Sequence, residues 1–243
     1  MPVHGIIFDI DGTLVDTNPT HVEAWQRAFK ALGYDVPTDR IEVEIGKGGD
    51  QLVPAILGDQ AEQRHGDRLR KGQKEEFLKL ARGRRFCVFA CVPELMKTLR
   101  DRKIRTALAT SSDEKHLRAT SESAGIDLSH LADFLVTNDE AESSKPAPDL
   151  VIAACEKLQL DPGECAMIGD TIYDAQACQG AGVVFLGVES GGTGAATLLA
   201  AGAAGVWVDT GHLYSDLDHA LERAASRQAP VVDHVHLHQE SSR

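Results

Sequence analysis

The sequence contains no apolar run long enough to cross a bilayer, so we expect no membrane-spanning helix and no membrane partner. The first residues also lack a basic stretch followed by a long apolar one, so we expect no secretory signal peptide. The 5 cysteines are odd in number and include no Cys-x-x-Cys pair, which predicts buried free thiols instead of disulfides or a redox pair. Together these absences predict a cytoplasmic protein.

Positive charge is scarce as well. The chain carries 25 lysines and arginines against 37 aspartates and glutamates, a formal net charge of −12 at pH 7. This excess argues against nucleic acid or an anionic membrane surface as a partner. A small anionic substrate is still compatible with it if a metal ion, a lysine or a helix N-terminus neutralises that substrate locally. The 243 residues are enough for one large or two unequal domains, in a monomer or a homodimer.

The most informative segment lies near the N-terminus, where an acidic turn from Asp9 to Thr13 follows a short apolar run. That run, residues 6–8, predicts a buried strand. Asp9 and Asp11 are two positions apart, so in an extended chain both carboxylates address one point beyond the strand end, where open α/β sheets bind ligands. One carboxylate could attack an electrophile while the other moves a proton. A plain acidic turn is the alternative, whereas an EF-hand loop is excluded because its twelfth position is Thr20 and no helix precedes it.

The next segment, residues 18–83, predicts several charged helices. Asn18 is expected to cap the first helix and Pro19 to follow it, because proline loses no amide donor there. Apolar residues then recur at helical spacing as far as Gly33, which is expected to end the helix. Further helices are expected at 39–45, 50–57 and 59–80, the last with an uncertain break near Gly66.

From residue 93 onward, helices and strands alternate, which predicts a parallel sheet covered by helices on both faces. The sheet would begin with strand 5–9. The later strands are expected at 105–110, 134–137, 164–168, 183–188 and 206–208, and the helices at 94–101, 113–124, 149–158, 173–180 and 212–224. We therefore predict an α/β protein with a core of residues 1–17 and 84–226, a helical insertion of residues 18–83 and a mobile tail of residues 227–243.

Three later segments place polar residues at predicted strand ends. Residues 110–112, Thr-Ser-Ser, offer hydroxyls and free amides before a helix, which suits anion binding and equally suits simple helix capping. Lys145 lies in a loop where it could neutralise a phosphate or be merely solvated. Asp170 ends a strand, and Asp174 lies one helical turn later, where it could also just complement the helix N-terminus. With Asp9, these carboxylates predict an oxygen-rich pocket suited to Mg²⁺.

In order and spacing, these motifs resemble those of the haloacid dehalogenase-like superfamily of phosphotransferases. The four motifs are Asp-x-Asp-Gly-Thr, a threonine after the second core strand, Lys-Pro-x-Pro-Asp and Gly-Asp-x-x-x-Asp, and they extend over essentially the whole chain. The insertion resembles the helical cap of the phosphoglycolate-phosphatase and β-phosphoglucomutase branch. The resemblance implies a Rossmann-like, doubly wound parallel sheet with an inserted all-helical cap domain.

The resemblance also implies catalytic roles. Asp9 would be the nucleophile that takes the phosphoryl group. Asp11 would protonate the leaving oxygen and then deprotonate the water that cleaves the aspartyl-phosphate. Thr110 and Lys145 would hold the phosphate, with Ser111 beside them. Asp11 argues for phosphoryl transfer, because dehalogenases have no alkoxide leaving group to protonate and resemble this pattern without the second carboxylate.

The expected cofactor is Mg²⁺. By the same resemblance its ligands would be the Asp9 carboxylate, the Asp11 backbone carbonyl, Asp170 directly and Asp174 through water. In the cap, Lys47 lies among glycines where related enzymes place a specificity loop. Lys47 has no obvious helical partner, so it could meet a substrate anion, although a flexible helix–helix connection is the alternative.

The sequence therefore predicts a phosphoric monoester hydrolase. Specifically, we expect an Mg²⁺-dependent phosphatase that hydrolyses small phosphorylated metabolites through an aspartyl-phosphate. The first alternative is a β-phosphoglucomutase-like phosphomutase, which would return the phosphoryl group to the sugar instead of giving it to water. A non-catalytic binding module is a remote alternative. The glycine-rich segment 190–194 could line the mouth of the site or form only a turn.

Overall fold

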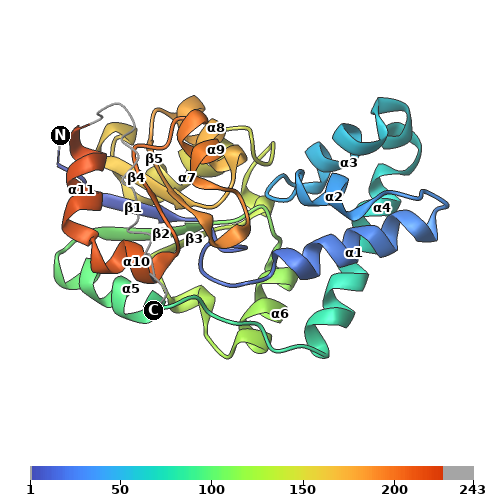
Figure 1. Cartoon of the computed structure of the whole chain (residues 1–243), viewed down its shortest axis with the longest axis horizontal. Helices are drawn as coiled ribbons and strands as arrows, with labels where there is room; N and C mark the ends of the chain where they lie inside the picture. Colours follow the sequence, from blue (N-terminus) through green and yellow to red (C-terminus); the bar gives the residue numbers. More distant parts are fainter. Residues whose placement is uncertain (1, 227–243) are drawn as a thin grey trace, which may run out of the picture.

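The centre of the molecule is a six-stranded parallel sheet, seen in the computed structural model of residues 2–226 (Figure 1). The strand order is β3-β2-β1-β4-β5-β6. The strands span Gly5–Phe8 (β1), Arg105–Ala109 (β2), Phe134–Val136 (β3), Cys165–Gly169 (β4), Val184–Val188 (β5) and Val206–Trp207 (β6). Chain order reverses direction between β1 and β4, so the carboxyl end of β1 lies at the point where open α/β sheets bind ligands.

Helices cover both faces of this sheet, which explains why its strands are apolar along most of their length. Ile6 and Phe8 point to one face and pack with α5, α6, α10 and α11, whereas Ile7 points to the other and packs with α7, α8 and α9. These helices span Val92–Asp101 (α5), Glu114–Ala124 (α6), Asp149–Leu158 (α7), Ile172–Ala181 (α8), Ala195–Ala200 (α9), Thr210–Ser215 (α10) and Leu217–Ser226 (α11). Short 3₁₀ turns lie at Leu128–His130, Asn138–Glu140, Pro162–Glu164 and Glu189–Gly191. The predicted doubly wound α/β core is confirmed.

An all-helical insertion between β1 and α5 stands beside the sheet (Figure 1). Its helices span Asn18–Ala31 (α1), Thr38–Glu42 (α2), Gly49–Leu57 (α3) and Asp59–Arg82 (α4). It has an apolar core of its own, to which Trp25, Phe29, Leu52 and Leu69 contribute. The insertion therefore buries its own apolar surface, and the predicted helical cap is confirmed as part of the fold.

Two helices of the cap differ from the prediction. Helix α2 stops before the predicted end at Ile45, because the chain turns there to bury Ile45 in the cap core. The next residue, Gly46, has a φ of +101°, and a Cβ at this position would lie 2.7 Å from Thr171 of the sheet domain. Helix α4 is unbroken at Gly66, where the Glu62 carboxylate fills the space that a side chain would need.

The C-terminal part also departs from the prediction. Helix α9 forms after segment 190–194, where no helix was expected. The single helix expected at 212–224 is divided at Asp216, whose carboxylate accepts a hydrogen bond of 2.9 Å from the Trp207 indole. The predicted tail, residues 227–243, lies outside the described residues. No helix within residues 2–226 is long and apolar enough to span a membrane.

The two connections between the core and the cap run side by side. The Asp16 amide donates a hydrogen bond of 2.9 Å to the Cys87 carbonyl, which pairs the outgoing segment with the returning one. A further hydrogen bond of 3.0 Å runs from the Arg84 guanidinium to the Thr20 hydroxyl. The first and last helices of the cap therefore leave the core at one place, close to the carboxyl end of β1.

Candidate active site

Asp9 and Asp11 lie where β1 gives way to a tight loop at the carboxyl end of the strand. The loop turns at Gly12, whose φ is +83°. A Cβ at Gly12 would lie only 2.4 Å from Oδ2 of Asp170. Glycine is needed here both for the backbone conformation and for the close approach to Asp170.

Lys145 lies between two carboxylates. Its ammonium donates hydrogen bonds to Asp9 and, over 3.0 Å, to the Ala109 carbonyl, and it lies 2.9 Å from Oδ1 of Asp174. The side chain is fully buried. Burial opposes its charge, but the Asp174 and Asp9 carboxylates outweigh burial and raise the pKa of Lys145 above its ordinary value. Lys145 is therefore a permanent buried cation held against Asp9.

Three carboxylates form a cluster, because oxygens of Asp9, Asp170 and Asp174 lie within 4.8 Å of one another. Burial raises the pKa of Asp9 to about 7 against the opposing charge of Lys145, with repulsion from Asp174 and Asp11 adding to the rise. Burial and repulsion from the other two carboxylates raise the pKa of Asp170 well above its ordinary value. When all three are ionised, Lys145 balances one charge and leaves two uncompensated. Both the charge and the oxygen ligands suit a divalent cation.

Two donors fix the Asp170 carboxylate, one on each oxygen. Thr13 Oγ1 donates to Oδ1 over 2.9 Å, and Asn18 Nδ2 donates to Oδ2 over 3.0 Å. The other amide atom of Asn18, Oδ1, is buried and has no hydrogen-bond partner within residues 2–226. Such an acceptor fits a water molecule, which a hydrated cation in the cluster would bring. The surroundings of the cluster thus also fit a metal ion.

Asp174 uses its two oxygens differently. Oδ2 accepts hydrogen bonds of 3.0 and 2.6 Å from the amide and hydroxyl of Thr171, which forms a capping box at the start of α8. Oδ1 faces Lys145 in the acidic cluster. The two interpretations that the sequence leaves open, helix capping and membership of a metal cluster, therefore apply to different atoms of one side chain.

Four side chains surround the Asp11 carboxylate. The hydroxyls of Thr17, Ser112 and Thr110 donate to it over 2.6, 3.1 and 3.4 Å, and Nε2 of His21 lies 3.2 Å away. Burial alone would raise the pKa of Asp11. The His21 imidazole and the hydroxyls of Thr17 and Ser112 outweigh burial and hold that pKa well below its usual range. Asp11 is therefore ionised in this arrangement.

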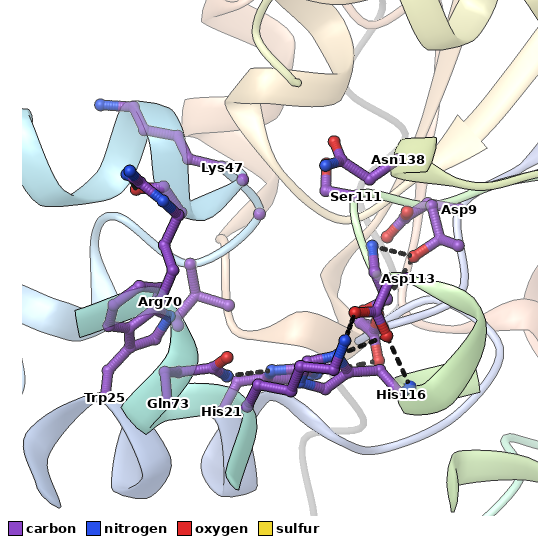
Figure 2. Close-up of a pocket in the computed structure, with 18 of the residues that line it drawn as sticks. Asp9, His21, Trp25, Lys47, Arg70, Gln73, Ser111, Asp113, His116 and Asn138 are labelled. Carbon is purple, nitrogen blue, oxygen red and sulfur yellow. Dashed lines mark hydrogen bonds and ion pairs between the residues drawn. The ribbon is translucent and has the colours of Figure 1, made fainter. Parts of the chain in front are cut away.

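The cap sets the orientation of His21. Nε2 of Gln73, on α4, lies 3.3 Å from Nδ1 of His21 (Figure 2). The contact holds the imidazole with Nε2 toward the Asp11 carboxylate, 3.2 Å away. The Phe77 ring stacks on His21 with 4.2 Å between the ring centroids. Two cap residues thus determine how His21 meets Asp11.

Asp9, Asp11, His21 and Gln73 border a cavity of about 420 Å³ between the core and the cap. In Figure 2, Trp25 and Arg70 of the cap face Asp9 and Ser111 of the core across this space. Ser111 Oγ has no hydrogen-bond partner within residues 2–226 and is available to a ligand. The contacts that join cap and core include the Lys74–Asp113 ion pair, a hydrogen bond of 2.7 Å from the Tyr173 hydroxyl to the Val43 carbonyl, and the Ser144–Asp50 hydrogen bond.

A known protein family shares this arrangement. A family model described as haloacid dehalogenase-like hydrolase matches residues 3–182. The chain belongs to the haloacid dehalogenase-like hydrolases. A phosphoglycolate phosphatase from Nitrosospira multiformis is 30% identical to this hydrolase over 186 residues, which cover 75% of this chain and 81% of the relative.

Solved structures agree with this assignment. A hydrolase from Pseudomonas syringae superposes on this hydrolase with a TM-score of 0.82 at 28% identity, covering 88% of this chain and 98% of the other. A β-phosphoglucomutase from Clostridium difficile shares the fold, with a TM-score of 0.76 at 19% identity over 90% of this chain and 97% of that one. The predicted superfamily, its phosphoglycolate-phosphatase and β-phosphoglucomutase branch and the class of phosphoric monoester hydrolase are confirmed. The alternative of a non-catalytic module is therefore set aside.

Lys47 of this hydrolase lines the cavity, but its ammonium already has partners. It forms an ion pair with Glu44 and lies 4.7 Å from the centre of the Tyr173 ring. The side chain extends away from Asp9 in Figure 2. Lys47 has no helical partner, as expected, but the chain turn after α2 brings Glu44 within its reach. A role for Lys47 in substrate choice stays a prediction.

Asn18 and His21 had no expected site role, yet the hydrolase places both beside its carboxylates. Ser112 was expected to suit an anion, and its hydroxyl donates to the Asp11 carboxylate. Asn18 was expected to cap α1, but the N-cap is Thr17, and the Asn18 side chain turns toward Asp170. The usable signal is spacing: Asn18 and His21 are three positions apart and share a helix face. Nothing in the pattern says what that face meets.

Segment 190–194 lies against the loop that follows Asp9. The Ser190 hydroxyl donates to the Gly12 carbonyl over 2.7 Å, and the Gly191 carbonyl accepts a hydrogen bond of 3.1 Å from Asn18. The segment therefore contacts the loop and the asparagine that hold the carboxylates of the hydrolase. It does not line the 420 Å³ cavity.

Proposed function

We propose that this hydrolase is an Mg²⁺-dependent phosphatase that removes phosphate from small phosphorylated metabolites through a phosphorylated Asp9. One observation carries the proposal: Asp9 borders the cavity with the Lys145 ammonium on its carboxylate, and Asp11 follows two positions later. An aspartate can attack phosphorus directly, and a cation beside it offsets the negative charge on the transferring group. Lys145 supplies one such cation.

In the first half of the reaction, an Asp9 oxygen forms a bond to phosphorus while the bond from phosphorus to the leaving oxygen breaks. The leaving oxygen takes a proton from Asp11 and departs as an alcohol. Phosphorus is now bonded to Asp9 as a mixed anhydride. Thr110, Ser111 and Lys145 are assigned to the phosphoryl oxygens, because Thr110 and Ser111 line the cavity with Asp9 and the Lys145 ammonium contacts the Asp9 carboxylate.

In the second half, a water molecule attacks the same phosphorus and gives its proton to Asp11. The bond between phosphorus and Asp9 breaks, inorganic phosphate leaves, and both aspartates return to their starting states. Asp11 therefore alternates between acid and base. His21, Thr17 and Ser112 hold the ionised form of Asp11, so they prepare it for this second half, and its protonation for the first half must weaken these contacts.

We assign the metal site to Asp9, Asp170, the Asp11 backbone carbonyl and, through water, Asp174. Bound there, Mg²⁺ supplies the positive charge that keeps Asp9 ionised and offsets the charge of the phosphoryl group. Without added positive charge the pKa of Asp9 is raised to about 7, which leaves much of it protonated at neutral pH. The chain's own residues position the nucleophile but leave the cluster short of positive charge.

The cavity also indicates the kind of substrate. Its volume of about 420 Å³ is at the small end for ligand pockets, which favours a metabolite over a macromolecule. Most cations on the cap wall are already paired, Arg70 with Glu62 and Lys74 with Asp113. Lys71 lines the cavity without an ion pair within residues 2–226. We assign Lys71 to a second anionic group of the substrate, a carboxylate or a second phosphate.

The proposal is tested by incubating the purified protein with Mg²⁺ and a panel of phosphorylated metabolites and measuring released phosphate. We expect release from short acid phosphates or sugar phosphates, loss of release with excess chelator, and none with Asp9→Asn. The phosphomutase alternative predicts a different outcome, in which a sugar phosphate is converted to its isomer without release of phosphate. Undiminished phosphate release after exhaustive chelation would refute the metal requirement.

A further inference from the structure

The first residue of the cap's first helix reaches into the acidic cluster. Asn18 is buried, and its Nδ2 donates hydrogen bonds to Oδ2 of Asp170 over 3.0 Å and to the Gly191 carbonyl over 3.1 Å. The Gly191 carbonyl can only accept, so the amide nitrogen must face it, and the orientation of the amide is fixed. Asn18 forms no hydrogen bond that caps its own helix.

Two glycines make room for this contact. A Cβ at Gly12 would lie 2.3 Å from Nδ2 of Asn18. A Cβ at Gly191 would lie 1.6 Å from Oδ2 of Asp170 and 2.8 Å from Nδ2 of Asn18. Two loops from distant parts of the chain therefore both omit a side chain at this point, and any other residue at either position would displace the pair.

The contact acts on the ionised form of Asp170. An N–H group donates a stronger hydrogen bond to a carboxylate than to a neutral carboxyl group, so Asn18 favours the anion. With Thr13 on the other oxygen, a donor in this position fixes how the Asp170 carboxylate faces the cluster.

We propose that Asn18 is a positioning residue, through which the first turn of the cap orients Asp170 for a divalent cation. The inference rests on the proposed function, because it presupposes that the acidic cluster binds Mg²⁺. The residue before it, Thr17, holds Asp11 over 2.6 Å. Two successive residues at the entrance to the cap thus hold two different aspartates, so cap position and metal affinity are coupled. By linkage, a cation in the cluster favours the cap position seen here.

The test measures metal affinity without any reaction. Mg²⁺ is titrated calorimetrically into the full-length wild type, Asn18→Ala and Asn18→Leu, in the absence of substrate. Leucine has the same number of side-chain heavy atoms and the same branching as asparagine but no donor, so it separates the lost hydrogen bonds from an empty space. We expect the Kd for Mg²⁺ to rise roughly tenfold or more in both variants, as for other residues that orient metal ligands. At saturating Mg²⁺, the kcat of both variants should return toward the wild-type value. The Mg²⁺ concentration that gives half-maximal rate should stay raised.

Thr20→Ala is the matched control. Thr20 is buried in the same first turn and holds Arg84 at the cap entrance, but it does not contact Asp170. Its Kd for Mg²⁺ should stay close to that of the wild type. An equal rise in Thr20→Ala would attribute the effect to a loosened cap entrance and overturn the inference.

Other outcomes separate this inference from the proposed function. If Asn18→Ala and Asn18→Leu bind Mg²⁺ with wild-type affinity, the inference fails while the proposed phosphatase stands. If the wild type releases phosphate but binds no Mg²⁺, the metal assignment and this inference fail together. Thermal melts in chelator check that each variant is folded before its affinity is measured.

Discussion

The Lys145 ammonium donates a hydrogen bond to the Asp9 carboxylate across 136 positions of sequence. Both side chains are buried, so neither charge is compensated by solvent. The cluster of three carboxylates has this one ammonium beside it, so losing Lys145 and losing the charge of Asp9 should affect stability in opposite directions. Removing Lys145 isolates negative charge, whereas removing the charge of Asp9 relieves repulsion.

Lys145→Met should therefore destabilise the metal-free protein strongly. Breaking a buried ion pair by removing one partner costs about 3–5 kcal/mol, because the remaining charge is left uncompensated. Urea unfolding in excess chelator measures this loss, and added Mg²⁺ should restore part of it. A variant with an unchanged free energy of unfolding in chelator would contradict the buried position of Lys145.

Asp9→Asn should abolish phosphate release and the trapping of BeF₃⁻, which mimics an aspartyl-phosphate. Its melting temperature in chelator should equal or exceed that of the wild type, because the raised pKa of Asp9 reports an unfavourable charge. Calorimetric melts beside a phosphate assay test both halves of this prediction. Near-normal turnover by Asp9→Asn would refute a mechanism that passes through phosphorylated Asp9.

Asp11→Asn should slow substrates according to their leaving groups. A sugar alkoxide needs a proton to depart, whereas p-nitrophenolate leaves readily without one. The rate of Asp9 phosphorylation, measured before turnover by rapid quench, should fall much more for a sugar phosphate than for p-nitrophenyl phosphate. Equal losses for the two substrates would count against Asp11 as the acid.

Lys71→Ala should raise KM for a doubly anionic substrate by more than Lys47→Ala does. Lys71 lines the cavity without an ion pair within residues 2–226, whereas Lys47 is paired with Glu44. Both changes should alter the free energy of unfolding by less than about 1 kcal/mol, as expected for exposed or partly exposed charges. Steady-state kinetics with a singly and a doubly anionic substrate provide the comparison, and the reverse order would favour the original assignment to Lys47.

The free energy of unfolding should decrease when the pH drops below about 6.5, and protonation of His116 in the unfolded chain should contribute to this decrease. Its Nδ1 lies 3.1 Å from Asp113, but Nε2 is buried without a partner within residues 2–226. Burial, against the opposing Asp113, lowers the pKa of His116 below its ordinary 6.5. Between the lowered folded value and the unfolded one, the unfolded chain binds more protons, so the free energy of unfolding decreases as the pH falls.

His116→Gln removes this titration and can still donate to Asp113. In saturating Mg²⁺, its melting temperature should depend less on pH between about 7 and about 5 than that of the wild type. Thermal melts at matched ionic strength provide the measurement. Identical slopes for the two proteins would show that His116 does not charge on unfolding in this range.

The core part of the candidate site could be predicted because the sequence pattern shows where the strands end. Hydrophobic runs locate the strands, and parallel strands bring their carboxyl ends to one edge, so Asp9 and Asp170 are expected together from pattern alone. Lys145 follows from its motif, although its loop carries no periodic signal. The structure brings these three side chains together, and their chemical roles remain proposals.

The cap side of the site could not be predicted in the same way. Helical spacing shows that Asn18 and His21 share a face, but what that face meets depends on how the cap docks. Docking is decided by contacts such as that from Tyr173 to the Val43 carbonyl, which join segments far apart in sequence. The pairing of Lys47 with Glu44 depends on where α2 ends, and helix boundaries are the part of a helix that a sequence pattern defines least well.

The central position of β1 has a consequence for biosynthesis. Gly5 pairs with Arg105 on one side and with Cys165 on the other, so the strand emerges from the ribosome long before both of its neighbours exist. At about 5–20 residues per second, roughly 8–30 s pass between the synthesis of β1 and that of β4. During that interval the strand that leads into Asp9 has an unpaired edge. Asp9 is thus translated early but is among the last residues to reach its place, and a nascent chain that ends before Asp174 cannot form the acidic cluster.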